Sequence, residues 1–361
     1  MSKKLFFLST LAILSTLGAG CVGFGGSSAP AGPMGVFRST DKGDSWQQSN
    51  VFPTTQGVKS LAGVKVYRIF TDPSDPNALY LATRGQGLYY SYDKGSSWQV
   101  AAAMQGRYIY ALAVDPTDKC TILVSDGANI FRTNDCSRTW KTVYTEQRGQ
   151  RIVALGFDYS KRATVYAALF GGQILESLNG GDGWRAIKTF KANLQFLATD
   201  PLTPGRIYVA GADSGFIRSD DGGRTWVSLS RSLQSFNESL YFYRLVLHPS
   251  KKNTLYWISK YGILYSEDAG DSWTDVKLLS PPGSVSIYAF AVNPSNAKEM
   301  YYVGTVLGEN TASRSTFYKT TDGGNNWVTK KLPTNTIPVS MVIHPTETGT
   351  LFMGFTIPDK K

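Results

Sequence analysis

The sequence predicts an all-β chain that forms a seven-bladed β-propeller of four-stranded antiparallel blades. Three observations support this prediction: one turn motif occurs seven times at intervals of 42 to 54 residues, a second turn precedes most copies by about 20 residues, and short apolar segments flank both. A repeat of this period is typical of propellers and solenoids, in which each unit buries its apolar face against its neighbours. We therefore expect one folding unit, not two or three separate domains.

The first motif is Ser/Thr-x-Asp-x-Gly-x-x-Trp. Its side-chain oxygens can accept hydrogen bonds from turn amides, its glycine can take a left-handed conformation, and its tryptophan can bury a large ring. We interpret the acid position as structural in every copy. Asn179 replaces the acid in the fourth copy, and Ser137 replaces the glycine in the third. The residues at the acid position are Asp41, Asp93, Asp135, Asn179, Asp221, Asp268 and Asp322.

The second motif is a short turn, in most copies followed by proline, that joins two apolar segments. In the first complete unit, residues 67–71 and 79–83 flank the turn, and residues 87–91 lead into the first motif. Each unit is thus four strands, A to D, with A and B joined at the second motif and C and D at the first. The second motif begins at Asp72, Asp115, Asp158, Asp200, His248, Asn293 and His344.

The two ends of the chain supply two halves of one blade. Residues 35–39 and 46–50 fit strands C and D only, whereas residues 339–343 and 351–355 fit strands A and B only. We expect the N-terminal pair and the C-terminal pair to combine, which closes the ring and protects its sheet edges.

The first motif resembles the Asp-box (BNR-like) repeat, which is known from sialidases, sortilin-type receptors, xyloglucan-active endoglucanases and photosystem II assembly factors. The resemblance covers residues 34–355. It implies a propeller that acts either by binding a protein or on a carbohydrate.

Insertions in the repeat indicate a candidate binding face. The connections from D to A are longest between Asp41 and Asp72 and between Asp221 and His248, and one B–C connection is enlarged at residues 304–316. D–A and B–C connections share one face of a propeller, and the face that accepts insertions is often the one that binds. We call it the insertion face, and we call the face of the A–B and C–D turns the regular face.

The positive signal for binding is basic and aromatic. Four residues before the second motif, the A strands carry mostly small residues, but Arg68 and Arg244 occupy this position in two blades. Arginine and tyrosine are enriched in protein interfaces. An arginine-rich face also resembles the photosystem II assembly factors, which bind a membrane-protein precursor. The predicted binding residues are Arg68, Arg244, Arg84, Arg107, Arg151, Lys260, Tyr67, Tyr108, Tyr243 and Tyr261.

Catalysis is the alternative. The two histidines, His248 and His344, occupy turn positions, so a histidine triad or a zinc site is not expected. A glycoside hydrolase needs only two carboxylates. Residues 67–70 (Tyr-Arg-Ile-Phe) also partly match a sialidase signature, without its proline. The acids expected on the insertion face are Glu146, Asp126, Asp213, Glu238 and Glu309. They show no recognisable pair, and no cofactor or metal is expected.

The N-terminus predicts secretion and a lipid anchor. Residues 1–20 have two lysines, an apolar run and small residues before Cys21, which resembles a bacterial lipoprotein signal. Residues 21–33 would then form a lipidated tether of roughly 20 Å, and residues 34–361 the propeller. Removing residues 1–20 takes the formal charge from +10 to +8, since two lysines and no acids are lost.

The expected location is therefore the bacterial cell envelope. We expect a monomer that binds a protein or an anionic polymer there, contacts the membrane only through its anchor and binds no nucleic acid. In that oxidising compartment, Cys120 in an A–B turn and Cys136 in the C–D turn of the same blade, both on the regular face, should form a disulfide.

Overall fold

The computed structural model describes residues 32–211, 215–307 and 313–358. They belong to one compact unit, Ala31–Lys361. The predicted signal peptide, Cys21, most of the tether, Asp213 and Glu309 lie outside the described residues. Within the part that is described, no helix is long and apolar enough to span a membrane.

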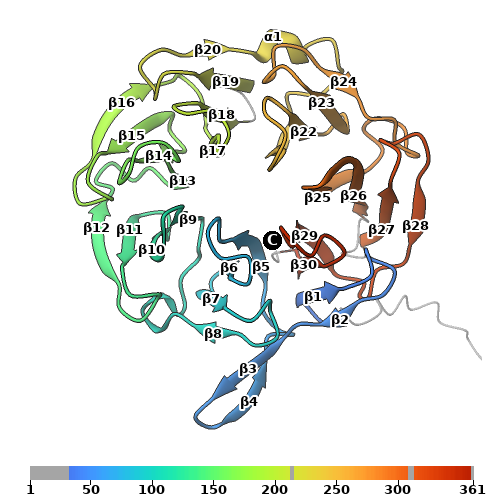
Figure 1. Cartoon of the computed structure of the whole chain (residues 1–361), viewed down its shortest axis with the longest axis horizontal. Coiled ribbons are helices and arrows are strands. Elements are labelled where there is room, and N and C mark those ends of the chain that lie inside the picture. Colours follow the sequence, from blue (N-terminus) through green and yellow to red (C-terminus); the bar gives the residue numbers. More distant parts are fainter. Residues whose placement is uncertain (1–31, 212–214, 308–312, 359–361) are drawn as a thin grey trace, which may run out of the picture. The chain divides into compact units, whose positions relative to one another are not determined.

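Seven four-stranded antiparallel sheets form the ring, and strand A of each blade is innermost (Figure 1). Blade 1 contains β5 (Val66–Thr71), β6 (Leu79–Thr83), β7 (Leu88–Ser91) and β8 (Gln99–Val100). Blade 2 contains β9 (Ala111–Asp115), β10 (Asp118–Ser125), β11 (Asn129–Thr133) and β12 (Lys141–Thr145). Blade 3 contains β13 (Ile152–Phe157), β14 (Val165–Leu169), β15 (Gln173–Ser177) and β16 (Arg185–Thr189).

The other half of the ring repeats this order. Blade 4 contains β17 (Phe196–Thr199), β18 (Ile207–Gly211), β19 (Gly215–Ser219) and β20 (Val227–Ser228). Blade 5 contains β21 (Phe242–Leu247), β22 (Leu255–Ser259), β23 (Ile263–Ser266) and β24 (Thr274–Asp275). Blade 6 contains β25 (Ser286–Asn293), β26 (Asn296–Leu307), β27 (Ser313–Thr320) and β28 (Val328–Lys330).

Blade 7 closes the ring as the sequence predicts. Its inner strands are β29 (Ile337–Ile343) and β30 (Leu351–Thr356), and its outer strands are β1 (Gly35–Ser39) and β2 (Gln47–Gln48). β1 pairs with β30 through five residues, from Gly35 opposite Phe355 to Ser39 opposite Leu351. The seven-bladed fold and its closure are therefore confirmed.

The enlarged connections carry structure of their own. The longest D–A connection forms a hairpin of β3 (Val51–Thr54) and β4 (Gly57–Ser60), which projects from the ring in Figure 1. The next longest contains the short helix α1 (Ser230–Leu233), and the connection after β8 contains the 3-10 turn η1 (Ala102–Met104). The enlarged B–C connection of blade 6 differs from a plain loop, because β26 and β27 stay paired out to Leu307 and Ser313.

The Asp-boxes are hydrogen-bonded hairpin turns. In the first, the Ser39 hydroxyl donates to Asp41 Oδ1 over 2.7 Å, and the backbone N–H of Ser45 donates to the same oxygen over 2.9 Å. Hydrogen bonds from the residue four positions later are the main reason that the pKa of this aspartate is lowered to about 2. The same value and the same main cause apply to Asp135, Asp221 and Asp322. The carboxylates of these four residues therefore serve to hold the turns together.

The third box is the irregular one. Ser137, in the position of the usual glycine, has φ 69°, and its neighbour Cys136 has φ 57° and is disulfide-bonded to Cys120. Cys120 lies in the first half of β10, next to the A–B turn. The disulfide thus links strand B to a turn that a non-glycine residue must hold in the left-handed region.

Ser137→Gly is expected to raise the free energy of unfolding by about 0.5–1 kcal/mol, because glycine adopts this conformation without the steric cost that a Cβ imposes. Urea denaturation followed by circular dichroism measures the change. Ser137→Ala, which keeps the Cβ, is the control and should give no gain. An equal gain in both variants would assign the effect to the hydroxyl.

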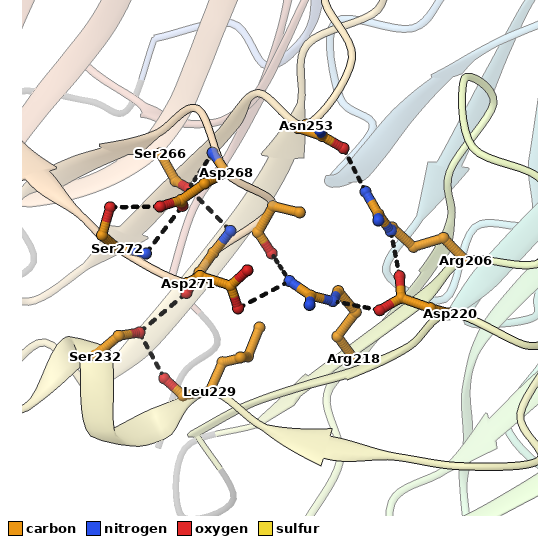
Figure 2. A network of polar contacts seen from close by, with 12 residues as sticks. Arg206, Arg218, Asp220, Leu229, Ser232, Asn253, Ser266, Asp268, Asp271 and Ser272 are labelled. Atoms are coloured by element: carbon orange, nitrogen blue, oxygen red, sulfur yellow. Dashed lines mark hydrogen bonds and ion pairs between the residues drawn. The ribbon is translucent and has the colours of Figure 1, made fainter.

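Basic residues directly before an Asp-box link blades to one another (Figure 2). Arg218 of blade 4 donates to the carbonyl of Ala269 in the box of blade 5 over 2.9 Å and pairs with Asp271 over 3.2 Å. Arg132 makes the same contacts from blade 2 to Gly180 and Asp182 of blade 3. Because these arginines are largely buried and hold box carbonyls, they fix each box against the next blade.

Candidate functional site

β-bulges shape the wall of the central channel. The register of five inner strands, β5, β13, β21, β25 and β29, shifts by one residue at the same place. In β5 the extra residue is Tyr67, in β21 Tyr243 and in β25 Tyr288. A bulge bends its strand and redirects the side chains beside it. The residue after each extra one is the position that carries Arg68 and Arg244.

Arg68 and Arg244 line the same cavity in the channel. Its volume is about 340 Å³, and its other lining residues are apolar or are Thr71 and the prolines of A–B turns, Pro249, Pro294 and Pro345. Arg68 also lines a neighbouring cavity of about 250 Å³. Among the residues that the structure describes, the lining of both cavities contains no carboxylate. The cavity of the two arginines therefore extends toward the regular face, whereas the sequence analysis grouped these arginines with the insertion face.

Each arginine is held in place by the channel wall. Nη2 of Arg244 donates over 2.9 Å to the carbonyl of Val339, the extra residue of the β29 bulge. The guanidinium of Arg68 lies 5.7 Å from the centre of the Phe70 ring. Burial, and then repulsion from Arg68, lowers the pKa of Arg244 to about 9. The two positive charges are thus close enough to oppose each other.

A tyrosine cluster forms where blades 1 and 2 meet at the channel. The rings of Tyr67 and Tyr108 have centroids 5.3 Å apart, and those of Tyr108 and Tyr110 stack at 4.1 Å. The guanidinium of Arg151 lies 5.4 Å from the Tyr110 ring centre. Gly127, at φ 96°, lets the B–C connection pass this ring, since a Cβ there would lie 2.9 Å from it. We call Tyr67, Tyr108, Tyr110 and Arg151 the tyrosine cluster.

A second aromatic group lies on blades 5 and 6. The ring centroids of Tyr243 and Tyr288 are 5.5 Å apart, and Tyr261 contacts Phe236 at 5.3 Å. Lys260 pairs with Glu238 and lies 5.4 Å from the ring centre of Tyr241, which is 59% exposed. The predicted binding tyrosines therefore fall into two groups, one on blades 1 and 2 and one on blades 5 and 6.

Of the remaining predicted cations, Arg107 is engaged through its side chain and Arg84 is held through its backbone. Arg107 pairs with Asp126 over 2.6 Å and lies 4.7 Å from the centre of the Phe131 ring. The backbone N–H of Arg84 donates to the carbonyl of Lys65 in the neighbouring strand connection.

The described acids of the insertion face also have local partners. Besides Asp126 and Glu238, Glu146 accepts hydrogen bonds from the Tyr144 hydroxyl and the Arg148 backbone, each over 2.7 Å. Among the residues that the structure describes, no cluster of three His, Cys, Asp or Glu side chains suits a metal ion. The geometry brings aromatic rings together, and Asp126, Glu146 and Glu238, the acids of this set that the structure describes, each have local partners.

Sequence reasoning missed Tyr110 and Tyr288, although a signal for them exists. Both lie five residues before the second motif, as do Tyr67 and Tyr243. Aligning the repeats on that motif gives tyrosine at this position in four of seven blades. In blades 1, 5 and 6 this tyrosine is the extra residue of the bulge.

Both histidines have turn chemistry. Nδ1 of His248 accepts the backbone N–H of Lys251 over 3.0 Å, and Nδ1 of His344 accepts that of Glu347 over 3.0 Å. Each Nε2 is buried without a partner among the described residues. Burial is the main cause that lowers both pKa values below 6.5.

Acidification from pH 7.5 to 5.5 is accordingly expected to lower the melting temperature. In the unfolded chain the histidines bind protons near pH 6.5, whereas in the folded chain they bind protons only at lower pH. Acidification through this range therefore favours the unfolded state and lowers the stability. The double variant His248→Asp/His344→Asp, which restores the residue of other blades, should lose less. Scanning calorimetry at both pH values compares the two, and an identical loss would contradict the assignment to these histidines.

The comparisons with known proteins agree with the propeller fold. A sequence profile of the Sortilin-Vps10 family (sortilin, neurotensin receptor 3) matches residues 34–166. Xyloglucanase Xgh74A of Acetivibrio thermocellus is 27% identical over 240 residues, which cover 54% of this chain and 28% of that protein. The photosystem II assembly protein Ycf48 of Thermosynechococcus vestitus is 22% identical over 192 residues, which cover 52% of this chain and 49% of that protein. The chain thus spans half or less of the length of these relatives.

Solved structures share the fold. The GH74 xyloglucanase of Xanthomonas campestris superposes with a TM-score of 0.63 at 16% identity, over 81% of this chain and 51% of that one. The structure titled YCF48 bound to D1 peptide superposes with a TM-score of 0.59 at 13% identity, over 82% of this chain and 94% of that one. The chain is therefore a seven-bladed β-propeller with Asp-box turns, similar in residues 34–166 to the Sortilin-Vps10 family and related both to xyloglucanases and to the Ycf48 assembly factor.

Proposed function

We propose that this chain is a non-enzymatic lipoprotein of the bacterial cell envelope that docks a protein partner on the insertion face. The tyrosine cluster is the observation that carries the proposal: three rings in contact, with Arg151 beside them, offer a rigid aromatic and cationic surface. Such surfaces bind proteins with little loss of side-chain entropy. Anchoring through Cys21 would hold the propeller near a membrane, where a membrane complex is assembled.

The relationship to Ycf48 supports this proposal, because the names of that relative and of its solved structure describe an assembly protein and a bound peptide. The local pairing of Asp126, Glu146 and Glu238 also favours binding over hydrolysis. Carboxylates that are held by neighbouring cations and hydroxyls are poorly placed to act on a substrate.

Photo-crosslinking in intact cells tests the docking face. The reactive residue p-benzoylphenylalanine replaces Tyr108 or Tyr241 on the insertion face and, as a control, Tyr159, which is 42% exposed in the A–B turn of blade 3. Discrete protein adducts are expected from positions 108 and 241 only. Adduct formation at position 108 should fall at least about fivefold with Arg151→Glu, since the cation would be reversed. Equal adducts from position 159, or none from 108 and 241, would contradict the proposal.

A xyloglucan-active enzyme is the second candidate, favoured by the 27% identity to Xgh74A. Release of reducing ends from xyloglucan is the measurement. Turnover that disappears when one acid of the insertion face is replaced by its amide would establish this candidate and displace the first. Binding of an anionic polymer without protein adducts would instead replace the protein partner by that polymer.

A further inference from the structure

The channel contains two like charges in a mostly apolar wall. Of the residues that the structure describes, Arg68 and Arg244 are the charged ones that line the cavity of about 340 Å³, and Phe70, Phe196, Leu245 and Phe290 make up much of the remainder. Both arginine side chains are partly buried. A buried arginine in a protein is ordinarily paired with a carboxylate, and the described lining contains no carboxylate.

Within the described part of the chain, few of the N–H donors of this pair are used. A guanidinium has five N–H donors in a planar fork, and the one side-chain hydrogen bond seen for Arg244 goes to Val339. That bond fixes the plane of the guanidinium from one side. Among the described contacts, Arg68 makes its ring contact with Phe70.

The bulges of β5 and β21 determine where Arg68 and Arg244 lie. The matching position of the A strand is alanine, serine or phenylalanine in the other blades, and Ser340 accepts the backbone N–H of Ile69 there over 3.0 Å. In blades 1 and 5 this position carries an arginine, and both arginines line one cavity. Two guanidinium groups in one cavity would be stabilised by an oxyanion that accepts hydrogen bonds from both.

From this geometry we propose that the channel binds an oxyanion of the carboxylate or phosphate class between Arg68 and Arg244, entering from the regular face. The site is separate from the proposed docking face, so it can stand or fall independently. A volume of about 340 Å³ suits a small molecule or one acidic side chain. The oxyanion has two possible sources, a free small anion or an acidic group of a partner.

Thermal unfolding of the purified chain tests the site, with inorganic phosphate, acetate and a triglutamate peptide as probes at constant ionic strength. A ligand that binds only the folded state raises the melting temperature in a saturable way. We expect a rise of at least about 2 °C with one or more probes in the wild type and in the control variant Arg162→Met, an exposed arginine at the A–B turn of blade 3. Arg68→Met and Arg244→Met should show no such rise.

The pattern of probes identifies the source. A rise with phosphate or acetate indicates a free anion, and a rise with the peptide alone indicates an acidic group of a partner. Arg68→Lys should retain a weakened response, because it keeps the charge and loses the fork. Without a probe, Arg68→Met should melt no lower than the wild type, since it removes a repulsive charge. If Arg244→Met does not fold, Arg68→Met still decides the matter. Equal responses in wild type and Arg68→Met, or no response to any probe, would overturn the proposal.

Discussion

Trp98→Ala is expected to lower the free energy of unfolding by about 3–5 kcal/mol, as for other large-to-small changes of a buried aromatic residue. Trp98 is fully buried, unlike the box tryptophans of several other blades. Its Nε1 donates to the carbonyl of Ser49 over 2.6 Å, and its backbone N–H donates to Val51 over 2.8 Å. The residue therefore holds blade 1 against the chain that leaves blade 7, at the junction where the ring closes.

Chemical denaturation followed by far-ultraviolet circular dichroism measures this loss. Trp327→Ala, at the same motif position in blade 6, is the matched control, because that tryptophan is only partly buried. It should cost clearly less. Equal losses of unfolding free energy at the two positions would contradict the assignment of the larger effect to the burial of Trp98.

Removing the disulfide is expected to cost about 3 kcal/mol, the value for a closed loop of about 15 residues. Cys120 and Cys136 are 16 residues apart, and the closed segment contains most of strand B and all of strand C of blade 2. Cys120→Ser/Cys136→Ser removes the constraint that this loop places on the unfolded chain. Cys136, which ends the loop, and Ser137, which follows it, both lie in the left-handed region.

Urea midpoints with and without dithiothreitol compare the wild type with this double variant. Reductant should lower the midpoint of the wild type to that of the variant and leave the variant unchanged. A reduced wild type, verified by thiol titration, with an unshifted midpoint would contradict the expectation.

The sequence predicted the blades closely because their signals are local. Strands predicted at residues 67–71 and 79–83 are observed at Val66–Thr71 and Leu79–Thr83, and β1 begins and ends where predicted. Each turn motif fixes its own hairpin through hydrogen bonds within about four residues, so reading it needs no knowledge of the rest of the chain.

The site was less predictable because it depends on contacts between blades. Arg68 and Arg244 are 176 positions apart in sequence, yet they line one cavity. A bulge, which has no reliable sequence pattern, decides that they enter the channel. The partners that engage Arg107 and Lys260 likewise lie in B–C and D–A connections, whose folded course the repeat does not specify.

The order in which strands are synthesised differs from the order in which blade 7 is built. β1 and β2 are made first, but the register of β1 is completed only by β30, more than 300 residues later in the chain. Blades 1 to 6 can each form from contiguous hairpins. The outer half of blade 7 keeps an unpaired strand edge until β30 has been synthesised. A chain truncated before residue 351 could therefore complete six blades but would leave its N-terminal strand exposed. Such a species is prone to self-association and to recognition by chaperones.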